Sequence, residues 1–188
     1  MPSKRPKLEM TISFIEADLE GISLAHNDAL VVQVEIASRP VRQVLIDTEA
    51  SVDLMSLDAY RQFGFGDDAL KHEGTSLHGF SRASATNKGS IDLLVTFGQA
   101  PCQMTIKVKF MVVRSVVAFN ATLGCPSLTA LHAIISPVHL KMKFPTENGI
   151  EEIRGDQKKA RECYATFVKQ NKRNVQGMAM CVEHLLED

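Results

Sequence analysis

The stretch Val44-Leu-Ile-Asp-Thr-Glu-Ala-Ser51 decides how the rest of the chain is interpreted. Three apolar residues typical of a buried strand lead directly to Asp47, and small or polar residues follow it. A carboxylate at the end of a buried strand is costly to remove from water, so it needs hydrogen-bond partners or a chemical task. Taken alone, Asp47 fits two interpretations: an Asx-turn that ends the strand, or a catalytic acid.

Predicted strands surround this stretch. Residues 30–36 and 41–46 form one predicted hairpin, and residues 91–97 and 102–113, in which apolar and polar residues alternate, form a clearer one. Shorter β-rich pieces follow at 133–135, 139–144 and, after the Asn148-Gly149 turn, 150–154. Short helices are expected at 56–63, ended by Gly64, at 126–131, and from Asp156 to about Gln170. Six to eight strands separated by turns predict a mostly antiparallel barrel or sandwich.

The composition is that of an ordinary globular protein. The chain has 188 residues, 45% of them hydrophobic and 23% charged, which suits about one domain. Its 21 Lys and Arg residues nearly balance its 22 Asp and Glu residues. The chain therefore lacks the net positive charge that is typical of a protein whose main partner is a nucleic acid. The basic clusters at residues 4–7 and 169–173 contain no interleaved aromatic residues and are interpreted as solvated tails.

Several other kinds of chemistry find no support in the residue spacing. The cysteines form no C-x-x-C pair and the histidines no H-x-x-x-H pair, so no metal site is predicted. A G-x-S-x-G nucleophile elbow is absent. The N-terminus has no apolar signal region, and the longest apolar run, 110–119, is too short to span a membrane. We therefore expect a cytoplasmic protein with no membrane partner.

A series of short motifs then runs along the chain in a fixed order. These are Leu30-Val-Val, Val44 to Ser51, Leu77-His-Gly-Phe80, Ile91-Asp-Leu-Leu-Val-Thr-Phe-Gly98, Phe119-Asn-Ala-Thr-Leu-Gly-Cys-Pro126, His139-Leu-Lys-Met-Lys-Phe-Pro-Thr146, Arg154-Gly-Asp-Gln157 and Ala160-Arg-Glu-Cys163. Together they resemble the retropepsin-type aspartic protease region of plant gypsy-type retrotransposon (gag-pol) polyproteins. The resemblance covers most of residues 28–170.

The resemblance implies a mainly β fold, a closed retropepsin-like barrel with one or two short helices and a C-terminal helical extension. It divides the chain into an N-terminal extension (1–27), a protease domain (28–154) and a helical C-terminal extension (155–188). It implies no cofactor and no metal.

The resemblance also implies a mechanism. The chain contains one Asp-Thr pair, so activity requires a homodimer in which two Asp47 side chains share a proton and activate water against a peptide bond. The substrate would be an extended peptide or polyprotein. The implied supporting roles fall on Thr48, Glu49, Ala50 and Ser51 in the catalytic loop, on Gly79, Phe80 and Gly89 in a flap, and on Leu123 and Gly124 in packing beneath the site.

Glu49 departs from the family pattern, which has glycine at this position. A glutamate adds a Cβ where the backbone bends closely and brings a second carboxylate to the site. Two functions therefore stay open. One is an aspartic endopeptidase. The other is a catalytically impaired dimeric domain that either binds peptides or is an inactive evolutionary remnant, a fossil domain.

Overall fold

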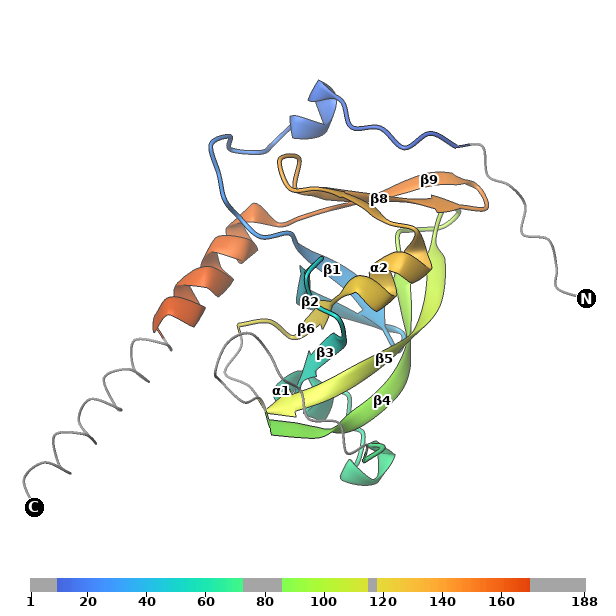
Figure 1. Ribbon diagram of the computed structural model, residues 1–188, viewed down its shortest axis with the longest axis vertical. Helices are drawn as coiled ribbons and strands as arrows, with labels where there is room; N and C mark the ends of the chain where they lie inside the picture. The colour runs from blue at the N-terminus through green and yellow to red at the C-terminus, as the bar shows by residue number, and fades with distance from the viewer. Residues whose placement is uncertain (1–9, 73–85, 115–117, 170–188) are drawn as a thin grey trace, which may run out of the picture.

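Six strands close into a barrel, and a separate three-stranded sheet lies beside it (Figure 1). The computed structural model describes residues 10–72, 86–114 and 118–169. The elements are η1 (Glu16–Leu19), β1 (Val31–Ile36), β2 (Arg39–Ile46), β3 (Asp53–Ser56), α1 (Leu57–Gln62), η2 (Asp67–Ala69), β4 (Thr86–Phe97), β5 (Met104–Arg114), β6 (Ala121–Leu123), α2 (Cys125–Leu131), β7 (Ile134–Ser136), β8 (Lys141–Thr146) and β9 (Gly149–Arg154). A last helix covers residues 157–169. The expected mainly β fold with a closed barrel is confirmed.

The predicted hairpins are present. β1 pairs antiparallel with β2, β4 with β5, and β8 with β9 through the turn at Asn148 and Gly149. In β1 and in the first half of β5, exposed and buried residues alternate, as the period-two pattern of the sequence predicts. The inward side chains, among them Ile36, Val95, Phe97 and Phe110, form the barrel core.

Two short strands that the sequence pattern missed complete the barrel. β6 lies between β2 and β3, parallel to β2 and antiparallel to β3, and β3 pairs in parallel with β5. The structure thus has nine strands in its described part, more than the six to eight expected. Strands of three and four residues carry too little periodicity to be recognised, and here pairing with distant segments holds them. This arrangement brings the end of β2 against the end of β6.

The helices begin and end where the sequence predicts. Ser56 accepts a hydrogen bond from Ala59 N at the start of α1, and Gly64 follows its end with a φ of +78°. Asp156 accepts from Lys159 N at the start of the last helix. Among the described helices, none is long and apolar enough to span a membrane.

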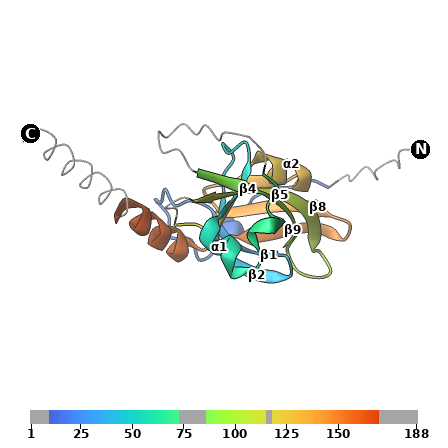
Figure 2. The same ribbon diagram turned by 90° about the horizontal axis from the view of Figure 1, so that it is seen from below.

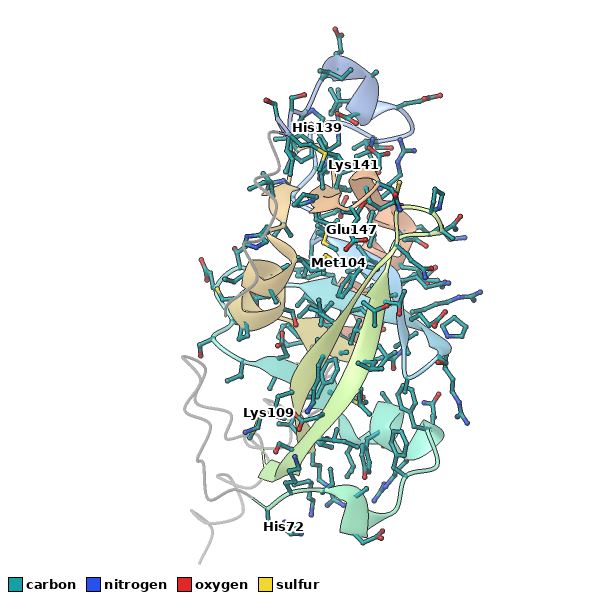
Figure 3. All side chains as sticks on the ribbon, turned by 90° about the vertical axis from the view of Figure 1, so that its right-hand side faces the viewer. His72, Met104, Lys109, His139, Lys141 and Glu147 are labelled. Carbon is teal, nitrogen blue, oxygen red and sulfur yellow. The ribbon has the colours of Figure 1, made fainter. Side chains whose placement is uncertain are left out.

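The sheet β7–β8–β9 packs between the barrel and the N-terminal segment. Phe97 of the barrel and Phe144 of β8 meet edge to face at 6.2 Å. On the other side, the segment that carries η1 runs over β8 and β9, and Figure 3 shows His139 and Lys141 beneath it. The chain before β1 is therefore packed against the body of the protein in its described part, from residue 10 onward.

Candidate active site

Asp47 lies where the parallel strands β2 and β6 end together. Its backbone N–H donates to the carbonyl of Leu123 at 3.0 Å, and its side chain is half-buried. Its Oδ1 accepts a 2.9 Å hydrogen bond from the backbone N–H of Glu49. This bond is the Asx-turn that the sequence offered as one interpretation. It also fixes one carboxylate oxygen, so the Asx-turn and a catalytic role are compatible.

The loop that follows Asp47 is fastened to the turn between β6 and α2. Cys125 N donates to Ala50 O at 2.8 Å, and the Cys125 thiol donates to Thr48 O at 3.0 Å. Gly124 is buried beneath the loop: a Cβ there would lie 2.5 Å from Ala50 O and 2.7 Å from Val52 O. Only glycine allows this close approach of two backbones. Leu123, fully buried, lies on the same short strand end.

Asp53 is a buried acid that the sequence analysis did not single out. Only 3% of its surface is exposed, and its Oδ1 accepts a 2.7 Å hydrogen bond from Gly124 N. Burial raises the pKa of Asp53, and the hydrogen bond from Gly124 opposes that shift. Asp53 thereby links the end of the Asp47 loop to the turn between β6 and α2. No local signal distinguishes Asp53, since Asp92 also precedes two apolar residues, Leu93 and Leu94.

Around Asp47, the predicted loop residues occupy the surface. Thr48, Glu49 and Ser51 are exposed and Ala50 is half-buried. Glu49 is not among the described residues with a left-handed φ, so the backbone of this single chain does not demand glycine there. Within one chain, Glu49 therefore carries no backbone strain from a left-handed φ.

The predicted flap lies mostly outside the described residues, which do not include Gly79 or Phe80. Gly89 is described and lies in β4 at an irregularity in the β4–β5 register, with a φ of +139°. A Cβ at Gly89 would lie 2.9 Å from Lys71 O, and the neighbouring Ser90 pairs with Lys71. Gly89 thus allows residue 71 to approach the start of β4.

A second buried acid, Asp18, lies on the N-terminal segment. Its carboxylate contacts Lys141 Nζ at 2.6 Å and Lys143 Nζ at 2.8 Å, and Glu152 also lies 3.0 Å from Lys141 Nζ. The Lys141 and Lys143 hydrogen bonds hold the pKa of Asp18 well below its usual range. Phe14 stacks on His139 beside this cluster. Sequence reasoning missed the cluster because more than 120 residues separate Asp18 from its partners.

Within the described residues, no group of three or more His, Cys, Asp or Glu side chains is arranged to hold a metal ion. The candidate site is Asp47 with the groups that hold its loop in place.

Comparison with known proteins relates this arrangement to solved structures. The retroviral protease-like domain of Ddi1 from Leishmania major matches 71% of this chain and 95% of its own, with a TM-score of 0.50 and 16% identity. The chain has the retropepsin-like fold. EIAV protease in complex with the inhibitor HBY-793 (TM-score 0.44, 20% identity, 61% of this chain and 99% of its own) and a retropepsin-like aspartic protease from Rickettsia conorii (0.42, 18%, 65% and 80%) also match.

No protein-family model matches the chain, and no curated protein sequence does. At 16% identity, the match to the Ddi1 domain establishes the fold alone, so the activity has to be argued from the site.

Proposed function

We propose that the protein is a retropepsin-like aspartic endopeptidase that acts as a homodimer with one Asp47 from each chain. The position of Asp47 carries the proposal. Its carboxylate stands half-buried at the shared end of β2 and β6, with one oxygen fixed by Glu49 N. The retropepsin-like fold supports the same conclusion.

The proposed mechanism uses the two Asp47 side chains as a pair. Adjacent carboxylates cannot both ionise, so they share one proton across the dimer axis. One acts as general base toward a water that attacks the scissile carbonyl. The other holds the shared proton and donates it to the substrate as general acid. Thr48 would join the two loops across the dimer. The flap that includes Gly79, Phe80 and Gly89 would close over an extended peptide.

The proposed substrate is an extended segment of a polyprotein. The order of the motifs from Leu30 to Cys163 supports descent from a plant gypsy-type retrotransposon, whose polyprotein needs processing.

Glu49 favours a second candidate function, a peptide-binding dimer that does not cleave. With Glu49 in both chains, up to four carboxylates would surround one water site, and the extra charge would disturb the shared proton.

The test is cleavage of an extended peptide at mildly acidic pH by the wild type, Asp47→Asn and Glu49→Gly, with Glu147→Gly as the control for losing an exposed glutamate. Activity that Asp47→Asn abolishes establishes the enzyme. Activity in Glu49→Gly alone selects the impaired dimer. No cleavage in any variant, or a monomer by analytical ultracentrifugation at micromolar concentration, contradicts the dimeric protease.

A further inference from the structure

A groove separates β5 from α2, on the side of β5 that faces away from β4. It is lined by the end of the catalytic loop, by β5 and by α2: Ser51, Val52, Asp53, Ile106, Lys107, Val108, Lys109, Met111, Pro126, Ser127 and Ala130. Its volume is about 420 Å³, within the range of roughly 300–1,000 Å³ for sites that bind ligands. Figures 1 and 2 both show α2 beside β5.

The wall formed by β5 is an open strand edge. β5 pairs with β4 along its length, from Met104 to Arg114, but β3 pairs with β5 only from Phe110 to Val113. Among the described residues, no strand pairs with the other edge of residues 104–109. An open edge presents backbone N–H and C=O groups in the spacing that an added strand requires. Six residues of edge span about 20 Å.

The two faces of this edge differ in character. Val108 is buried and Ile106 half-buried on the inner face, while Thr105, Lys107 and Lys109 are exposed on the outer face. Across the groove, Pro126 and Ala130 of α2 add small apolar surface. A strand added here would have alternate side chains against an apolar wall, and the side chains between them would lie beside two lysines.

The charges around the groove favour an acidic partner. Lys107 lies 3.4 Å from Asp92 of β4, but its side chain is 68% exposed and retains donors for a second carboxylate. Lys109 is also exposed on β5; it already has an interaction within the protein, and its ammonium group, with three donors, can bind a further carboxylate. Asp53 lines the groove end, yet it is buried and already accepts from Gly124 N, so it presents little charge to an occupant. Opposite charges on neighbouring strands attract each other.

We propose that the groove between β5 and α2 binds an extended peptide segment of a partner protein by strand addition to residues 104–109. The segment carries apolar residues at alternate positions, facing α2, with acidic residues between them beside Lys107 and Lys109. This binding is separate from the proposed cleavage and requires neither Asp47 nor a dimer.

The probe is a fluorescein-labelled octapeptide of alternating valine and glutamate, measured by fluorescence anisotropy against the full chain. We expect saturable binding, and changes in amide chemical shifts over residues 104–109 and 126–130 rather than 47–49. The same peptide with lysine in place of glutamate should bind at least ten-fold more weakly. Methylation of alternate backbone nitrogens should abolish binding, because it removes the donors that pair with the open edge.

Variants locate the site independently. Reversing both charges in Lys107→Glu/Lys109→Glu should weaken binding roughly ten-fold or more, and Ala130→Phe should fill the groove and block it. Lys158→Glu, an exposed lysine on the last helix, is the matched control and should bind like the wild type. Circular dichroism and thermal unfolding establish that each variant is folded.

Three outcomes would overturn the proposal. The first is binding that survives both Ala130→Phe and the double charge reversal. The second is a peptide affinity that methylation of the backbone nitrogens does not weaken, which would indicate charge attraction alone. The third is no binding by any peptide, which would leave Lys107 and Lys109 as edge lysines that oppose self-association.

Discussion

The carboxylate of Asp53 accepts a 2.7 Å hydrogen bond from the backbone N–H of Gly124. This bond joins the end of the loop that carries Asp47 to the turn that supports it from below. Because Asp53 is buried, both the hydrogen bond and the charge of this side chain affect stability.

Asp53→Ala should destabilise the protein by about 1–3 kcal/mol, because it leaves the buried Gly124 N–H without a partner. Asp53→Asn keeps an oxygen acceptor and should cost less. Urea unfolding of the two variants measures the difference. Equal losses in both would mean that this hydrogen bond contributes little.

The raised pKa of Asp53 predicts how the difference in stability between Asp53→Asn and the wild type depends on pH. The folded state holds the Asp53 proton more tightly than the unfolded state, so this group's contribution to stability falls as pH rises above the ordinary value of 3.8. Asp53→Asn lacks this titration. The stability of Asp53→Asn relative to wild type should therefore increase from pH 3.5 to pH 7, measured by urea unfolding at each pH. A constant difference would show that Asp53 does not titrate in this range.

Gly124→Ala should destabilise the protein by about 1–3 kcal/mol through overpacking, because its Cβ would press on Ala50 O and Val52 O. Gly64→Ala is the control: its Cβ meets nothing within 4 Å, and its cost comes only from its φ of +78°. Amide chemical shifts of residues 47–52 should change in Gly124→Ala and not in Gly64→Ala. Unchanged shifts in Gly124→Ala would contradict the close approach.

The Asp18 cluster predicts acid sensitivity of the N-terminal segment. The lowered pKa of Asp18 means that its contribution is present above the unfolded value of 3.8 and is lost as pH falls below it. Asp18→Asn should lower the Tm at pH 7 by several degrees, since it leaves the buried Lys141 short of a partner. Its Tm should also fall less steeply than the wild-type Tm below pH 4.

Glu16→Gln controls for this effect, because Glu16 is an exposed acid in the same turn as Asp18. Equal pH profiles for Asp18→Asn and wild type would show that the ion pairs contribute nothing to stability.

The cysteines should react in the order of their exposure. Cys125 is exposed, Cys102 half-buried and Cys163 buried, and burial raises the pKa of the Cys163 thiol. In a Cys181→Ser background, iodoacetamide should alkylate Cys125 first and Cys163 only on unfolding, as followed by mass spectrometry of peptides. Early modification of Cys163 would contradict its buried position on the last helix.

Much of the fold follows from local sequence. The alternation in residues 102–113 predicts β5, the Asn148-Gly149 turn predicts the β8–β9 hairpin, and Ser56 and Gly64 bound α1, all as observed. The short strands β3 and β6 were missed, because only their partners on distant segments make them strands.

Of the candidate site, too, one part was predicted from the sequence and another part was found only in the structure. Asp47 was found from sequence because an acid at the end of an apolar strand is visible locally. Asp53, Cys125 and Asp18 were not, because their partners lie more than 70 residues away in the chain. Hydrogen bonds at such separations leave no periodic signal.

By itself, the sequence determined the hairpins, the helix ends and the acid at the end of β2, since turn chemistry, capping and side-chain alternation act between near neighbours. Only the tertiary structure decided that β6 lies between β2 and β3 and that Gly124 and Asp53 fasten the loop of Asp47. It also decided that, in the part of the chain that the structure describes, no strand pairs with residues 104–109 of β5 on the edge beside α2. Those relationships depend on which distant segments pair, and that choice is made by burial of the shared core rather than by any local pattern.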